Sequence, residues 1–112
     1  MKLWIDDVRP APKGYVWCRS VNQAKEGITL RERMDGVRLL FEPYNEVISP
    51  FELIDIDHDA GDYASDGGDY IKLLDWLEET GRNYPIRIHS MNPVGVANMR
   101  AIIKRNGWTE VR

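Results

Sequence analysis

The fold is decided by a stretch in which an apolar segment ends abruptly in charge: Phe51-Glu52-Leu53-Ile54-Asp55-Ile56, followed directly by Asp57-His58-Asp59. A short run of aliphatic and aromatic residues bounded by polar ones is typical of a strand buried in a sheet. The segment therefore predicts a strand whose carboxyl end carries two carboxylates and an imidazole.

The same pattern occurs twice more along the chain. Leu3-Trp4-Ile5 precedes Asp6-Asp7, and Pro85-Ile86-Arg87-Ile88 precedes His89-Ser90. Strands alternate with helical segments, which indicates βαβ units and a mainly parallel sheet. Ligands of such sheets bind beyond the carboxyl ends of the strands. We therefore expect the three polar clusters to meet at one edge of the sheet and to form the working site.

Three helices are predicted between and after these strands. Ser20 and Gln23 match a capping box, Ser at the N-cap and Gln three residues later. Residues 70–77 place Tyr70 and three leucines on one helical stripe. A third helix begins with Asn92 as its N-cap and ends at Gly107.

The remaining segments complete a single three-layer α/β domain over residues 1–112. Tyr15 to Cys18 and Trp108 to Val111 have strand composition. Within residues 36–49, Val37-Arg38-Leu39-Leu40-Phe41 and Glu46-Val47-Ile48 flank the turn signal Pro43-Tyr44-Asn45, which predicts an inserted β-hairpin.

Composition restricts the class of protein. A length of 112 residues suits one domain. The net charge of −3 argues against bulk binding of nucleic acid, but not against a local pocket for one nucleotide end. The single cysteine, Cys18, excludes an internal disulfide and favours a reducing compartment. No apolar run could span a membrane and the N-terminus does not read as a signal peptide, so we expect a cytoplasmic protein without membrane contacts.

Four carboxylates, those of Asp6, Asp7, Asp57 and Asp59, would lie close together at the predicted edge. Like charges at short range raise pKa values or require a counter-charge. Mg²⁺ or another divalent cation would supply that charge, because hard cations prefer oxygen ligands. The guanidinium of Arg9 is the alternative, since it can bridge carboxylates or hold a phosphate. Carboxylates that are only solvated or that cap a loop are the third interpretation.

Both histidines of the chain, His58 and His89, follow strands at this edge. Histidine titrates near neutral pH, so the pair could act as general base and general acid in phosphodiester hydrolysis. They could instead bind a metal together with Asp57 or Asp59, or serve a structural role.

The segment after His89 adds a candidate anion site. A helix N-terminus offers free backbone N–H groups and the positive end of the helix dipole. Ser90 and Asn92 supply further hydrogen bonds there, so a phosphate could bind beside His89. The alternative is that Asn92-Pro93 is only a favourable helix start.

Taken in order, these motifs resemble the cyclic-phosphate processing receiver domain, a family related to the receiver domains of two-component signalling. The resemblance covers nearly the whole chain. It rests on residues 3–12, Ile56 to Gly61, Gly68-Asp69-Tyr70, His89 to Gly95, and Asn98-Met99.

The resemblance implies a receiver-like, flavodoxin-like fold and the processing of cyclic phosphates in RNA repair or nucleotide metabolism. It also implies that Asp6 and Asp7 are the acidic pair that holds Mg²⁺. Asp57 would stand at the phospho-accepting position, and Ser90 would be the hydroxyl residue that ends the fourth strand. The expected substrate-binding residues are Arg9, Ser90, Asn92 and Asn98.

The chain departs from an ordinary receiver in several respects. No lysine follows the final strand, and the loop from Arg9 to Gly14 replaces the first helix. His58 and His89 are additional, and the stretch from Gly36 to Ser49 reads as an insertion that could be a lid or an interface. These departures argue against a role in phosphorelay and favour an enzymatic activity.

Three functions follow as hypotheses. The first is an enzyme that opens a cyclic phosphate of a small nucleotide or an RNA end, with His58, His89 and Asp57 as catalytic residues. The second is a signalling receiver phosphorylated on Asp57. The third is a non-catalytic module that binds a nucleotide or a protein.

Overall fold

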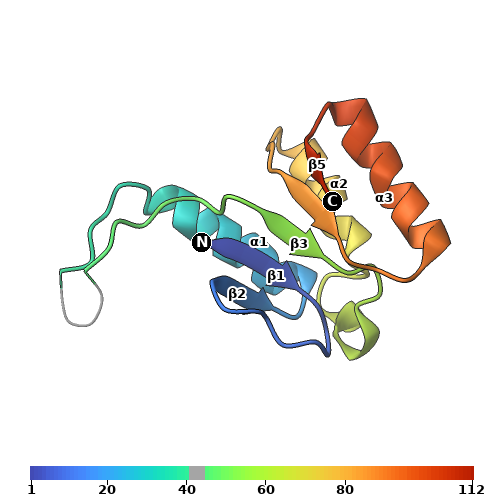
Figure 1. Ribbon diagram of the computed structural model, residues 1–112, viewed down its shortest axis with the longest axis horizontal. Helices are drawn as coiled ribbons and strands as arrows, with labels where there is room; N and C mark the ends of the chain where they lie inside the picture. Colours follow the sequence, from blue (N-terminus) through green and yellow to red (C-terminus); the bar gives the residue numbers. More distant parts are fainter. Residues whose placement is uncertain (41–44) are drawn as a thin grey trace.

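A computed structural model describes residues 1–40 and 45–112 as a five-stranded sheet with helices (Figure 1). All strand pairs are parallel, in the order β2-β1-β3-β4-β5, so the predicted parallel α/β domain is confirmed. The strands are β1 (Lys2–Ile5), β2 (Tyr15–Cys18), β3 (Ile54–Ile56), β4 (Ile86–Ile88) and β5 (Glu110–Val111). The helices are α1 (Val21–Arg33), α2 (Ile71–Glu79) and α3 (Pro93–Asn106), with a 3-10 turn η1 (Gly61–Ser65).

The predicted N-caps of α1 and α3 and the predicted end of α3 are confirmed. The Ser20 hydroxyl accepts a hydrogen bond from the Gln23 backbone N–H at 3.1 Å, which satisfies a free donor in the first turn of α1. The Asn92 side chain caps α3 in the same way, and Gly107 ends that helix in the left-handed conformation. No helix among the described residues is long and apolar enough to cross a membrane.

All three helices pack on one face of the sheet. α1 contacts α2 and α2 contacts α3, and their apolar stripes form a single core with alternate residues of the strands. The third layer of the predicted three-layer arrangement is therefore not made by helices in the described chain. The strand residues of that core include Leu3, Ile5, Ile54, Ile56 and Ile86.

Residues between these core positions point to the opposite, helix-free face, because side chains alternate along a strand. Trp4, Asp55 and Arg87 stand in register across β1, β3 and β4. The loop that joins β1 to β2 covers part of this face, since the Trp4 indole N–H donates to the Arg9 carbonyl at 2.8 Å. That loop replaces a helix, as the sequence predicts.

Several predicted strands are shorter than expected, including the last, which is reduced to Glu110–Val111. Phe51 to Leu53 lie outside β3, although the Leu53 carbonyl still accepts the Leu3 N–H at 2.9 Å. In the predicted hairpin, Arg38 and Val47 form an isolated antiparallel bridge rather than two regular strands. Residues 41–44, which include most of the predicted turn, lie outside the described residues.

Candidate functional site

The loops that follow β1, β3 and β4 bring three predicted site residues together. One carboxylate oxygen each of Asp6 and Asp57 and one ring nitrogen of His89 lie within 4.8 Å of one another. Each residue follows directly on a strand, and the three strands are neighbours in the sheet. The parallel topology thus produces the cluster, as the sequence predicts.

His89 is bound on both sides by buried carboxylates. Its Nδ1 lies 2.6 Å from an oxygen of Asp55, and its Nε2 lies 3.0 Å from an oxygen of Asp6. Both aspartates are fully buried, and the His89 side chain is 7% exposed. An ionised carboxylate only accepts hydrogen bonds, so both bonds form together when both ring nitrogens carry protons. The geometry is that of an imidazolium between two carboxylates.

Two further side chains fix the His89 ring in place. The Trp4 indole stacks on it with the ring centroids 4.0 Å apart and the planes 5° from parallel. Arg87 donates to the second oxygen of Asp55 at 3.0 Å, so this carboxylate has two positive partners. The ring therefore has no rotational freedom and no open nitrogen in this arrangement.

Asp6 is the most heavily bonded carboxylate of the site. Burial acts to raise its pKa, but hydrogen bonds from the backbone N–H groups of Arg9 and Val8 and from His89 hold the pKa below its ordinary value. One oxygen accepts both backbone bonds, at 2.8 and 2.9 Å, and the other accepts the bond from His89. Asp6 is thus ionised and its acceptor oxygens are engaged.

His58 has a different environment from His89. Its Nδ1 lies 2.8 Å from an oxygen of Asp59, an aspartate whose side chain is 66% exposed. Asn92 Nδ2 is 3.4 Å from the same nitrogen, too distant to compete with the carboxylate. Nε2 has no hydrogen-bond partner among the described residues, whereas every completely buried polar side-chain atom there has one. Nε2 is therefore not completely buried, although the His58 side chain is only 15% exposed.

Gly95 in the first turn of α3 makes room for the His58 ring. A Cβ atom at this position would lie 2.4 Å from both Cγ and Cδ2 of His58, far inside van der Waals contact. The backbone of Gly95 is itself fixed, because its N–H donates to the Asn92 side chain at 3.0 Å. The ring of His58 therefore lies flat against the amino end of α3.

A groove of about 490 Å³ opens beside these residues. Carboxylates of Asp57 and Asp59 lie on one side, and Arg9 contributes the cation. Pockets of this volume hold small ligands. The other lining residues come from the start of α3: Ser90, Met91, Asn92 and Pro93.

Five predicted site residues do not line this groove: Asp6, Asp7, His58, His89 and Asn98. The Asp7 carboxylate is packed against Gly61, where a Cβ atom would be only 2.3 Å away. Asp7 still lies near the same tyrosine as the cluster. Burial raises the pKa of Tyr70 most, and the negative charges of Asp7, Asp6 and Asp57 raise it further. Asn98 is exposed on α3, one turn beyond Gly95.

Asp55, Arg87 and Gly95 were not predicted as site residues. A signal for the first two exists in the sequence, because Ile54-Asp55-Ile56 and Ile86-Arg87-Ile88 each place one charge inside an apolar strand. The two positions pair across β3 and β4. Opposite charges at matching strand positions indicate an ion pair across the two strands, here between buried Asp55 and the 44% exposed side chain of Arg87. The role of Gly95 needs the packed structure.

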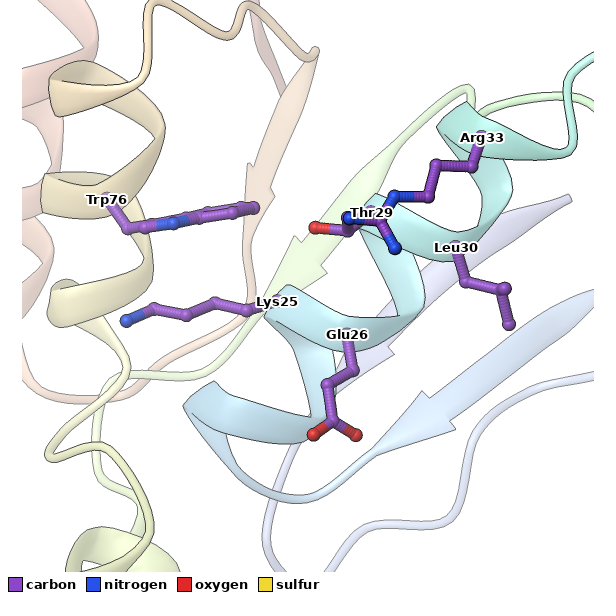
Figure 2. A pocket seen from close by; sticks show the side chains of 6 residues that line it. All are labelled: Lys25, Glu26, Thr29, Leu30, Arg33 and Trp76. Atoms are coloured by element: carbon purple, nitrogen blue, oxygen red, sulfur yellow. The ribbon is translucent and has the colours of Figure 1, made fainter.

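A separate groove lies between α1 and α2, away from the histidines (Figure 2). In it, Lys25 lies beside Trp76, with the ammonium 5.9 Å from the ring centroid. The groove contains no histidine and no member of the acidic cluster, so we do not assign the site there. Its lining is completed by Glu26, Thr29, Leu30 and Arg33.

Comparison with known proteins agrees with this architecture. No curated protein and no solved structure matches the chain. Residues 1–105 match the family described as cyclic-phosphate processing receiver domain. The matched range contains β1 to β4, the acidic cluster and both histidines, and it spans nearly the whole sequence. The chain therefore belongs to the cyclic-phosphate processing receiver domain family.

Proposed function

We propose that this groove hydrolyses a 2′,3′-cyclic phosphate, with His58 as the general base. The observation that carries the proposal is the arrangement of Asp59, His58 and the groove. When Nδ1–H donates its hydrogen bond to Asp59 at 2.8 Å, the nitrogen without a proton in the neutral ring is Nε2, and no described residue bonds to it. A carboxylate that fixes the tautomer of a histidine in this way is the usual support of a general base.

The reaction is a hydrolysis with a simple balance. His58 Nε2 takes one proton from a water molecule as the water oxygen attacks phosphorus. The bond from phosphorus to one ribose oxygen breaks, and that oxygen takes a proton from solvent. The product is a phosphate monoester, and His58 returns its proton to water. General base catalysis of this kind contributes about 10²–10⁴-fold in rate.

Phosphate binding is assigned to the cationic side of the groove. Arg9 and the amino end of α3 supply positive charge, and Ser90 and Asn92 add polar atoms. In this proposal His89 is a fixed positive charge behind Asp57 rather than a second proton carrier. That differs from the acid–base pair expected from the sequence, because both ring nitrogens of His89 are engaged.

The expected divalent cation fits this donor set poorly. Asp6 already accepts hydrogen bonds on both oxygens, one of them from His89. A cation between Asp6 and Asp57 would have to displace the imidazolium, which provides the counter-charge those carboxylates need. We therefore route no step through a metal. We expect turnover to continue when EDTA is added.

The test is to incubate the protein with 2′,3′-cyclic AMP, with and without EDTA, and to follow the phosphorus signals by NMR. The proposal predicts conversion to a monophosphate at equal rates in both samples. A rate restored only by added Mg²⁺ or Mn²⁺ would reinstate the metal. Absence of turnover on cyclic nucleotides and on cyclic-phosphate RNA ends would reject the hydrolase.

One observation favours phosphorylation of Asp57 as a second candidate function. Its carboxylate lines the groove beside Arg9 and Ser90, and its Oδ1 accepts the His58 N–H at 2.7 Å, which leaves Oδ2 toward an incoming phosphoryl group. Treatment with acetyl phosphate and Mg²⁺, followed by mass spectrometry of wild type and Asp57→Asn, tests this. A phosphoryl group on wild type alone would support the receiver function.

A further inference from the structure

A second groove continues from the phosphate groove along the outer side of α3. It has a volume of about 640 Å³ and shares Ser90, Met91 and Pro93 with the first groove. The shared residues make the two hollows one continuous surface. Beyond them, the lining consists of Val96, Ala97, Arg100 and Lys104.

The lining of the second groove follows helical periodicity. Pro93, Val96, Ala97, Arg100 and Lys104 are spaced as i, i+3, i+4, i+7 and i+11, which places them on one stripe of α3. The stripe that faces the core is different, since it contains Gly95, Met99, Ile102 and Ile103. The outer stripe is therefore a surface track that begins at the phosphate groove.

The chemistry of this track changes along its length. Its near half is apolar, and Met91, at 87% exposed, stands at the junction of the two grooves. Its far half is cationic. Arg100 is paired with Glu110 at 2.9 Å, whereas Lys104 has no ion-pair partner among the described residues. Lys104 is thus the cation available to an anionic ligand.

Distance decides which ligand fits. Lys104 lies eleven residues after Pro93, which is roughly 16 Å along the helix at 1.5 Å per residue. A mononucleotide bound by its cyclic phosphate at the start of α3 carries no second phosphate to reach Lys104. Stacked nucleotides advance about 3.4 Å each, so a strand of several nucleotides would span the track.

We propose that the track is a subsite for the nucleotides upstream of a cyclic-phosphate RNA 3′ end. This inference rests on the proposed function and deepens it, because it makes a single-stranded oligonucleotide the preferred substrate. Bases would lie against Met91, Val96 and Ala97, and an upstream phosphate would bind Lys104. The subsite is local, which agrees with the acidic net charge of −3.

The experiment compares a cyclic mononucleotide with a hexanucleotide that ends in a 2′,3′-cyclic phosphate, because about five steps of 3.4 Å are needed to place a phosphate at Lys104. We expect a higher kcat/KM for the hexanucleotide with wild-type protein. Lys104→Glu should lower that value about tenfold and leave the mononucleotide unchanged. Lys25→Glu is the matched control, because it makes the same charge change in the groove of Figure 2. Equal values for the two substrates, or equal effects of the two variants, would overturn the subsite.

A binding measurement separates this inference from the hydrolase proposal. The Kd of a fluorescent hexanucleotide ending in a 3′-phosphate needs no turnover. We expect Lys104→Ala to weaken binding and to reduce the slope of log K against log salt by about 0.7, the value for one phosphate contact on a single strand. If neither substrate is hydrolysed, that loss of slope still supports the track. An unchanged slope, or no binding, overturns it whatever the activity.

Discussion

His89 and His58 follow neighbouring strands, yet they lie in opposite environments. His89 is 7% exposed, stacks on Trp4, and has a buried carboxylate on each ring nitrogen. His58 is 15% exposed, with one exposed carboxylate partner and a second nitrogen that has no hydrogen-bond partner among the described residues. Both ring nitrogens of His89 are engaged in hydrogen bonds, whereas only one ring nitrogen of His58 is. Residue type alone therefore does not identify a proton carrier.

The difference arises from the two faces of the sheet. His89 lies on the helix-free side with Trp4 and Asp55, where stacking and ion pairs replace a helical layer. His58 lies in the loop after β3, against the amino end of α3 at Gly95. The first region holds the fold together, and the second adjoins the groove. The predictions below test this division.

Replacing His58 with Ala should have the largest effect on activity. Loss of the general base predicts a fall of about 10²–10⁴-fold in kcat on 2′,3′-cyclic AMP, measured by product release. The free energy of unfolding should fall less than in His89→Ala, because the ring packs on Gly95 but its one short hydrogen bond is to an exposed partner. Full activity in this variant would contradict the role of His58.

Replacing His89 with Ala should have the largest effect on stability. The change leaves the carboxylates of Asp6 and Asp55 buried without their shared partner. Removing one member of a buried ion pair costs about 3–5 kcal/mol, which urea unfolding would detect. A loss below about 1 kcal/mol, comparable to that of an exposed pair, would show that the bridge is not formed in solution.

Replacing Gly95 with Ala should displace the His58 ring without removing it. The new Cβ would lie 2.4 Å from two ring atoms, and a misplacement of about 1 Å can cost about 10²-fold in rate. Gly27→Ala in α1 is the control, because its Cβ would meet nothing closer than 3.9 Å. Both variants gain helix propensity. Equal activity in the two would mean that the ring position is not critical.

Replacing Asp6 with Asn should have the smallest effect, on the pH dependence of stability. The pKa of Asp6 is depressed in the folded protein, so its contribution is complete above the unfolded value of about 3.9. That contribution is lost as pH falls through the folded pKa. Unfolding free energies measured from pH 6 downward should therefore decline in wild type and be flatter in Asp6→Asn. Parallel curves would contradict the assignment.

Much of the scaffold was predictable because its signals are local. The capping residues Ser20 and Asn92 and the terminal Gly107 depend on a few neighbouring residues. The strand ends at Asp6, Asp57 and His89 are marked by an abrupt change from apolar to charged residues. Parallel topology then brings those ends together without further information.

The rest depends on contacts between distant residues. The ion pair of Asp55 with Arg87 requires knowing that β3 and β4 are neighbours and in register. In the described chain, no helix covers one face of the sheet. Strand residues on that face therefore need not be apolar, unlike those of strands that are buried on both faces. The different roles of His58 and His89 depend on their hydrogen-bond partners. The partner of His58 is the next residue, Asp59, whereas Asp6 is 83 residues from His89 in the sequence.

The most direct test of this division is chemical modification of the two histidines in the native protein. Diethyl pyrocarbonate acylates a free imidazole nitrogen, and peptide mass spectrometry locates the product. We predict that His58 is modified at the same rate as activity on 2′,3′-cyclic AMP is lost, because its Nε2 has no hydrogen-bond partner among the described residues. His89 should stay unmodified until the protein is unfolded in urea. Modification of His89 as fast as His58 in the folded protein would contradict the account.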